Sequence, residues 1–333
     1  MALENIVIAG DWQDMGAIPH NLTAIDKTLS TIASTFDSSN TTVILNGDIT
    51  DNHAFYHRDM DGDFDAANEP FYQNISDEGA KEIYEQNSGK DYDSLPAEAK
   101  EDILLQIKKN FAGDAYIHEV NNIIKEKLVD KGFETKAVMG NNEFLVCGAA
   151  RISPDQLPYI NEQLRTMIEQ QTGISYIDRS TDSFQEIGGV KVISDPYWIM
   201  NGGNKKRHME LGDHPDPEKS PIYKKLNDAD LQKGEHVVLA LHGGPDKKYG
   251  DVALNTFLAE TSQTVFVTHG HGELDFEKDG ERIHYETNDN GGEIFYVNTN
   301  NLPANKRSGY SYANLRAEDG KVLGIDISEV CYK

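Results

Sequence analysis

Residues 41–52 read TTVILNGDITDN, a run of β-branched and aliphatic residues that stops at a glycine and an aspartate. Such a short apolar run is typical of a buried strand. Asp48 follows this run, so a carboxylate is expected at the carboxyl end of the strand. In α/β sheets, ligands bind at the carboxyl ends of strands. The stretch therefore predicts a strand that delivers Asp48 to a binding site.

Four other predicted strands also end in a polar residue. They are IVIAG (6–10) before Asp11, KAVMG (136–140) before Asn141, VVLAL (237–241) before His242, and VFVT (265–268) before His269. Amphipathic stretches lie between them, and helices are expected at 22–36, 97–111, 116–132 and 155–172. Gly132 is suited to a left-handed cap at the end of the third helix. This alternation indicates an α/β fold, and five such strand endings are difficult to attribute to surface turns.

The remaining sequence predicts further strands and two long connecting segments. A two-strand unit is expected at 184–195, a hairpin at 274–286, and single strands at 293–299, 311–317 and 321–327. A loop is expected over 196–222, and the polar stretch 53–116 is expected to be an insertion that caps the site. No repeat or linker divides the chain, so residues 1–333 are expected to form a single domain.

The strand endings supply carboxylates, amides and imidazoles, with no thiolate among them. These oxygen and nitrogen donors suit Mn, Fe, Zn or Mg rather than a structural cysteine site. A carboxylate such as Asp48 can bridge two cations about 3.5–4 Å apart, and such a pair promotes in-line displacement at phosphorus.

In their order along the chain, these segments resemble the motifs of the calcineurin-like metallophosphoesterase superfamily. The family order is GDxH, GDxxD, GNHE, a lone histidine after a strand, and GHxH. The matching segments here are GDWQ (10–13), GDITD (47–51), GNNE (140–143), His242 and THGHGE (268–273). The HGG at 242–244 is similar to the protein Ser/Thr phosphatase branch. The resemblance implies a four-layer αββα sandwich with a helical insertion and two divalent metal ions at one edge.

The resemblance also implies a set of metal ligands. They are Asp11, Gln13 and Asp48 for one metal, and Asp48, Asn141, His242 and a histidine of the last motif for the other. Two registers of the last motif stay open, because THGH retains His269 and His271 whereas GHGE pairs His271 with Glu273. We favour the register with two histidines.

Two residues depart from the family pattern. Gln13 replaces a histidine ligand, and its neutral oxygen is a weaker donor. Asn142 replaces the histidine that is expected to protonate the leaving oxygen, and an amide donates a hydrogen bond but transfers no proton at neutral pH. Asn142 is therefore expected to hold phosphoryl oxygens, and Asp51 to orient the group that replaces the acid or to cap the next turn. Arg207 and Arg307 are candidates for binding the substrate phosphate, with exposed loop charge as the alternative.

The sequence thus predicts a metal-dependent phosphoesterase in which a metal-activated water attacks a phosphomonoester or phosphodiester. The substrate would be a phosphoprotein or a nucleotide-type phosphoester. The alternative is a catalytically impaired binding or scaffold protein with a phosphatase fold. The replacement of two family histidines by Gln13 and Asn142 favours this alternative, whereas the other retained metal-ligand residues favour the enzyme.

The composition limits the binding partners and the cellular location that are expected for this protein. The formal net charge of −25 argues against binding to nucleic acid or to anionic membranes. The two cysteines form neither a disulfide framework nor a zinc motif, and the start of the sequence lacks a signal-peptide pattern. A cytoplasmic protein is therefore expected, with secretion by a route that uses no cleaved signal left open. The sequence does not indicate an oligomeric state.

Overall fold

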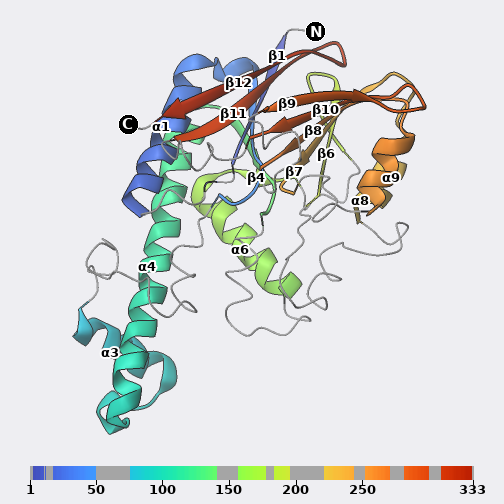
Figure 1. The fold of residues 1–333 in the computed structure, drawn as a ribbon. Helices are drawn as coiled ribbons and strands as arrows, with labels where there is room; N and C mark the ends of the chain where they lie inside the picture. Colours follow the sequence, from blue (N-terminus) through green and yellow to red (C-terminus); the bar gives the residue numbers. More distant parts are fainter. Residues whose placement is uncertain are drawn as a thin grey trace.

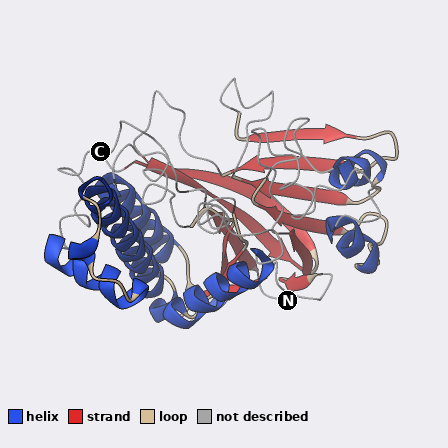
Figure 2. Ribbon diagram, turned by 90° about the horizontal axis from the view of Figure 1, so that it is seen from below, coloured by secondary structure: helices blue, strands red, loops and turns tan. Residues whose placement is uncertain are grey.

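In the part of the chain that the structure describes, two six-stranded sheets form the centre and helices flank them (Figures 1 and 2). The computed structural model describes residues 3–10, 12, 18–49, 76–140, 157–177, 184–195, 221–243, 252–270, 281–299 and 309–331. Within these residues the layers follow the order helices, sheet, sheet, helices, which confirms the predicted αββα sandwich.

The first sheet has the strand order β12-β11-β1-β2-β3-β4. Its strands are β1 (Glu4–Ala9), β2 (Thr41–Leu45), β3 (Glu134–Ala137), β4 (Ser175–Tyr176), β11 (Gly309–Glu318) and β12 (Lys321–Cys331). The strands β1 to β4 are parallel, and β11 and β12 add an antiparallel pair beside β1. Because Ala9 aligns with Leu45 and Leu45 with Ala137, three strands end at the same edge.

The second sheet has the strand order β5-β6-β7-β8-β10-β9. Its strands are β5 (Gln185–Ile187), β6 (Val190–Asp195), β7 (His236–Leu241), β8 (Thr264–His269), β9 (Ile283–Thr287) and β10 (Glu293–Asn298). The four central strands are parallel, and the two edge strands are antiparallel to their neighbours. The ends of β8 and β10 also coincide, since His269 aligns with Asn298.

Three apolar clusters fill the spaces between the layers. The helices α1 (Ile18–Thr35), α4 (Ala97–Lys127) and α6 (Leu157–Thr172) cover the first sheet, and α8 (Pro221–Asp228) and α9 (Val252–Glu260) cover the second. Alternate residues of β1 face opposite sides: Val7 belongs to the cluster under the helices, whereas Ile6 and Ile8 belong to the cluster between the sheets. None of the described helices is long and apolar enough to cross a bilayer.

The helix α4 differs from its prediction. It is one helix of 31 residues, where the sequence indicated two helices at 97–111 and 116–132. The junction contains Gly113 but no proline, and a single glycine within a helix costs only about 1 kcal/mol relative to alanine. After α4, a 3-10 turn η4 (Val129–Lys131) ends at Gly132, whose φ of 86° confirms the predicted left-handed cap.

The predicted insertion at 53–116 is partly described. It contains α3 (Asp77–Ser88), a 3-10 turn η3 (Tyr92–Ser94) and residues 97–116 of α4. Tyr84 and Tyr92 pack edge to face with ring centroids 5.9 Å apart. In Figure 1 this part extends away from the two sheets. Residues 53–75 lie outside the described residues, so a cap over the site stays a prediction.

Some elements differ from the sequence analysis. The predicted hairpin at 274–286 is not tested, because residues 274–280 lie outside the described part. Residues 283–286 belong to β9, which pairs antiparallel with β10 through a turn at 288–292. The helices α8 and α9 were not predicted. Each has fewer than ten residues, and periodicity alone does not distinguish such short apolar segments from strands or loops.

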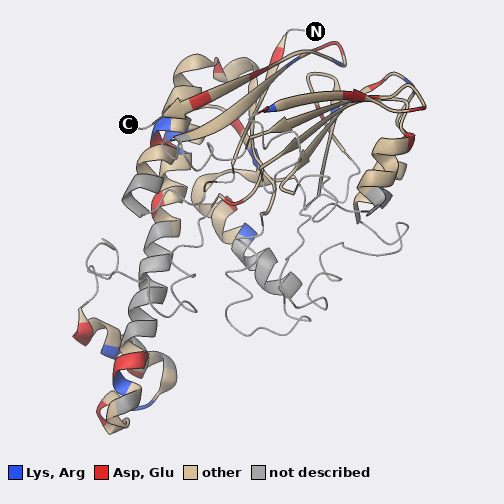
Figure 3. Ribbon diagram, in the orientation of Figure 1, with Lys and Arg blue, Asp and Glu red and all other residues tan. Residues whose placement is uncertain are grey.

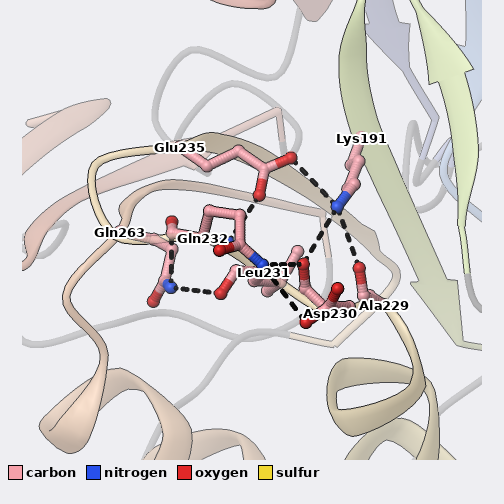
Figure 4. Close-up of polar contacts among 7 residues, drawn as sticks. All are labelled: Lys191, Ala229, Asp230, Leu231, Gln232, Glu235 and Gln263. Atoms are coloured by element: carbon pink, nitrogen blue, oxygen red, sulfur yellow. Dashed lines mark hydrogen bonds and ion pairs between the residues drawn. The ribbon is translucent and has the colours of Figure 1, made fainter.

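A polar cluster holds the loop between α8 and β7 (Figure 4). Lys191 Nζ of β6 donates to the carbonyl oxygens of Ala229 and Asp230 at 2.9 and 3.3 Å, and it forms an ion pair with Glu235 at 3.0 Å. Gln263 Nε2 donates to the carbonyl oxygens of Leu231 and Gln232. These bonds satisfy backbone carbonyls of the loop and fix the point at which β7 begins.

Candidate metal centre

Two polar side chains from different sheets face each other at the carboxyl ends of β2 and β7. Asp48 follows β2 and His242 follows β7, and both are fully buried. The distance between His242 Nε2 and Asp48 Oδ2 is 3.4 Å. The sandwich therefore joins the two sheets at a carboxylate–imidazole pair, and both members were predicted as metal ligands.

A backbone carbonyl orients the imidazole. His242 Nδ1 lies 3.0 Å from the carbonyl oxygen of Asn46. Because a carbonyl oxygen only accepts hydrogen bonds, Nδ1 carries the proton and Nε2 is the nitrogen that faces Asp48. Histidines that bind metals commonly donate their other N–H to a carbonyl or carboxylate in this way. The ring is thus held in the tautomer that a metal ligand requires.

The turn that carries Asp48 has left-handed backbone at two consecutive residues. Gly47 has a φ of 93° and Asp48 a φ of 47°. A Cβ at Gly47 would lie 2.5 Å from His242 Nδ1 and 2.7 Å from Gly140 Cα. The carbonyl oxygen of Asp48 accepts a hydrogen bond from the N–H of Trp12 at 3.1 Å. Such strained backbone tends to persist at binding sites, where the surrounding structure holds it in place.

His269 occupies the end of the neighbouring strand β8 and is fully buried. The N–H of Gly270 donates to the carbonyl oxygen of His242 at 3.1 Å, so the chain segments that carry the two histidines are adjacent. Among the described residues, no three His, Cys, Asp or Glu side chains come together to hold a metal ion. His269 therefore does not complete a three-ligand group with Asp48 and His242 in this part of the chain, and the register of the last motif stays open.

The other predicted site residues lie outside the described residues, and their roles stay predictions. They are Asp11, Gln13, Asp51, Asn141, Asn142, Arg207, His271, Glu273 and Arg307. Some of their sequence neighbours are placed. Gly10 packs against Asn46 and Gly47, Trp12 binds the carbonyl of Asp48, and Gly140 lies against Gly47. The segments that carry the first three motifs therefore converge on the turn before Asp48.

The sequence analysis missed two residues of this region, Asn46 and Thr299. Asn46 Nδ2 donates to Thr299 Oγ1 at 3.0 Å, and Thr299 Oγ1 donates to the carbonyl oxygen of His269 at 3.2 Å. Both side chains belong to residues that directly follow a strand, β2 and β10 respectively. Their position directly after a strand could have indicated these two residues, because the predicted ligands also follow strands.

The described donors suit a divalent cation. A buried carboxylate and a buried imidazole nitrogen face each other, and the imidazole is fixed from behind by a backbone carbonyl. Oxygen and nitrogen donors of this kind bind Mn, Fe, Zn and Mg. Asp48 and His242 are therefore candidate ligands for a metal centre at this edge.

A protein-family model described as calcineurin-like phosphoesterase matches residues 4–273. The chain belongs to this family. The match begins with β1 and ends at Glu273, so it contains all five motif segments and confirms the resemblance seen in the sequence. Calcineurin-like phosphoesterases hydrolyse phosphate esters and typically bind two divalent metals.

Other comparisons add little to the family assignment. No curated protein matches the chain. One solved crystal structure aligns with 98% of this chain and 99% of its own chain, at 13% sequence identity and a TM-score of 0.48. This similarity is too low to support an argument about function.

Proposed function

We propose that this calcineurin-like phosphoesterase is an active metal-dependent hydrolase of phosphomonoesters or phosphodiesters. The observation that carries the proposal is the buried Asp48–His242 pair, with the imidazole oriented by the carbonyl of Asn46. Burial of a carboxylate and an imidazole is unfavourable unless they are paired or bind a cation. A binding scaffold has no chemical need for such a pair at the junction of two sheets.

Two divalent metals would supply an activated water and positive charge to neutralise the phosphoryl oxygens. Asp48 and His242 would hold them together with the ligands that the family resemblance implies. These are Asp11, Gln13, Asn141 and the histidines of the last motif, His269 and His271. Asn142 would donate a hydrogen bond to a phosphoryl oxygen, Asp51 would orient the group that protonates the leaving oxygen, and Arg207 and Arg307 would bind the phosphate of the substrate.

The substrate class follows from Asn142. Since an amide transfers no proton at neutral pH, we expect leaving groups that require little protonation. Aryl phosphates and phosphoanhydrides have such leaving groups. Of the two expected substrate classes, a phosphoprotein would then carry an aryl phosphate such as phosphotyrosine, and a nucleotide-type compound would be cleaved at a phosphoanhydride bond.

A catalytically impaired binding or scaffold protein is the second candidate. Gln13 and Asn142 favour it, because one weakens a metal site and the other removes the usual acid. This candidate predicts that the protein binds metal or a phosphorylated partner without turnover.

The test is hydrolysis of p-nitrophenyl phosphate and of its bis ester by metal-stripped protein refilled with Mn²⁺. We expect activity that requires the metal and that falls by more than about 100-fold in Asp48→Asn and His242→Gln. Loss of a metal ligand should reduce activity more than loss of a residue that only hydrogen-bonds to a ligand, which costs about 10–100-fold. His284→Gln is the matched control, since His284 lies on the edge strand β9. Mn²⁺ binding without turnover would favour the scaffold, and a protein that neither binds Mn²⁺ nor hydrolyses either ester would refute the proposal.

A further inference from the structure

Asn46 connects the two sheets through both its backbone and its side chain. It follows β2 of the first sheet and is fully buried. Its carbonyl oxygen accepts from His242 Nδ1 at 3.0 Å, and its side-chain Nδ2 donates to Thr299 Oγ1 at 3.0 Å. Both partners belong to the second sheet, at the ends of β7 and β10. One residue therefore forms two hydrogen bonds across the junction at which the ligand pair lies.

Thr299 continues this connection to the next strand. Its hydroxyl accepts from Asn46 Nδ2 and donates to the carbonyl oxygen of His269. The backbone N–H of Thr299 donates to the same carbonyl at 2.9 Å. The donor and acceptor roles of this hydroxyl are thus both used. A directed chain of hydrogen bonds runs from Asn46 through Thr299 to His269, across the ends of β2, β10 and β8.

Asn46 directly precedes the strained turn. Gly47 and Asp48 both have positive φ, and such backbone persists only where its surroundings determine it. Within the first sheet, the N–H of Asn46 is held by the carbonyl of Ala9 at 2.8 Å. The Asn46 side chain adds an anchor on the second sheet. These two attachments fix the turn that carries Asp48 relative to the strand end that carries His242.

The Asn46 side chain occupies space that is available only because residue 10 is a glycine. A Cβ at Gly10 would collide with Asn46 Oδ1 and would lie 2.9 Å from the backbone N of Asn46. Among the described residues, the buried Oδ1 has no hydrogen-bond partner. Any side chain at position 10 would displace the Asn46 amide, so the position of this amide is tightly constrained by its neighbours.

We infer that Asn46 and Thr299 are positioning residues that set the separation of Asp48 and His242 and the orientation of the His242 ring. The inference rests on the proposed function, because the pair is positioned in order to bind a divalent cation. Asn46 and Thr299 act through the ligands, and neither is proposed to touch the substrate.

The test is Mn²⁺ binding to the metal-stripped protein, measured by calorimetry for Asn46→Ala, Thr299→Val and Thr299→Ser. Valine keeps the shape of threonine and loses both side-chain hydrogen bonds, whereas serine keeps the hydroxyl. We expect the dissociation constant to rise by about 10–100-fold in Asn46→Ala and Thr299→Val, as for other outer partners of metal ligands. Thr299→Ser should stay close to the wild-type value.

A second readout requires no metal. In metal-free protein labelled with ¹⁵N-histidine, the Nδ1 proton of His242 is identified by its loss in His242→Gln. We expect this proton to exchange with water faster in Thr299→Val than in wild type or Thr299→Ser. Unchanged Mn²⁺ affinity and unchanged exchange in Thr299→Val would overturn the inference, whatever the melting temperature. If wild type binds no Mn²⁺, the proposed function fails, and the exchange rates alone decide whether Thr299 positions His242.

Discussion

Gly47 is the residue on which the contact between Asp48 and His242 most directly depends. Its left-handed φ of 93° disfavours any side chain, and a Cβ at this position would collide with the ring of His242 and the backbone of Gly140. Strand ends from both sheets therefore approach one another at a position that has no room for a Cβ. A substitution here is expected to change the spacing of Asp48 and His242 and to strain the backbone at the same time.

We predict that Gly47→Ala lowers the free energy of unfolding by about 1–3 kcal/mol and weakens Mn²⁺ binding. Urea unfolding and calorimetry measure the two effects. Gly89→Ala is the matched control, because Gly89 has a φ of 65° at the end of α3 and nothing within 4 Å of its hypothetical Cβ. Equal effects of the two substitutions on Mn²⁺ affinity would contradict this account, since only Gly47 contacts the ligand pair.

At the residue scale, the sequence could single out Asp48 and His242 as candidate metal ligands, but it could not single out Asn46 and Thr299. The first two could be recognised because a carboxylate or an imidazole at a strand end has few structural roles. Asparagine before a glycine is an ordinary turn residue. The positioning role proposed for Asn46 rests on a hydrogen bond to a residue 253 positions away, which no local pattern contains.

At the scale of elements, β7 is attached to the first sheet at both of its ends. His242 follows the carboxyl end and donates to Asn46, whereas His236 begins the strand and accepts from the N–H of Val322 on β12 at 3.1 Å. The His236 ring packs beside Phe266, with centroids 5.7 Å apart. Nδ1 of His236 must be unprotonated to accept this bond, so the attachment at this end depends on a neutral imidazole.

This attachment predicts a pH dependence of stability. Burial, followed by the positive charge of Lys321, lowers the pKa of His236 below its ordinary value of 6.5, and Glu293 opposes the shift. A histidine with a lowered pKa contributes stability that is present above the unfolded pKa and is lost as the pH falls through the folded pKa. The melting temperature should therefore decrease as the pH falls below about 6.5.

The variant His236→Asn isolates this effect. An asparagine oxygen can accept the hydrogen bond from Val322 but does not titrate in this range. Thermal unfolding of the variant should show a smaller decrease between about pH 7 and pH 5 than wild type. Parallel pH profiles for the two proteins would show that His236 is not the group responsible.

The elements were predicted best where they form long buried segments. The central strands and the helices at 22–36 and 155–172 were expected from periodicity, and the structure places α1 and α6 there. The two helices that the pattern separated join into α4, because no proline interrupts the chain between them. The short helices α8 and α9 were not predicted, because each packs on the second sheet through only a few apolar side chains and so shows little periodicity in the sequence.

At the scale of the whole molecule, the negative charge is the dominant electrostatic feature. The formal net charge is −25, and Figure 3 shows acidic residues on both sheets and on the projecting α3. A charge of this size destabilises the compact state through self-repulsion. Dissolved salt screens this repulsion, with a Debye length that falls from about 30 Å at about 0.01 M to about 10 Å at about 0.1 M.

We therefore predict that the melting temperature of the metal-free protein rises when NaCl is increased from about 0.01 M to about 0.1 M. Equimolar KCl should give the same rise, because screening depends on ionic strength rather than on the identity of the monovalent ion. A melting temperature that stays constant or falls over this range would show that the acidic surface does not limit stability.

The order of layers could be predicted from the sequence, but the alignment of the two sheets could not. The resemblance to calcineurin-like phosphoesterases implied a four-layer sandwich, which the three apolar clusters confirm. The relative placement of the sheets depends on non-local packing, such as that of Ile8 and Ile44 of the first sheet in one cluster with Val238 and Phe266 of the second. Side chains of this kind fit together only once both sheets exist.

The strand order of the first sheet also determines when this sheet can be completed during translation. The strand β1 lies between β2 and β11, and about 300 residues separate its end at Ala9 from the start of β11 at Gly309. At a translation rate of about 5–20 residues per second, β1 leaves the ribosome roughly 15–60 s before β11 exists. During this interval one hydrogen-bonding edge of β1 lacks its native partner, and such an edge is a template for pairing with other chains. Completion of the first sheet is therefore a late event in biosynthesis, when protection by chaperones matters most.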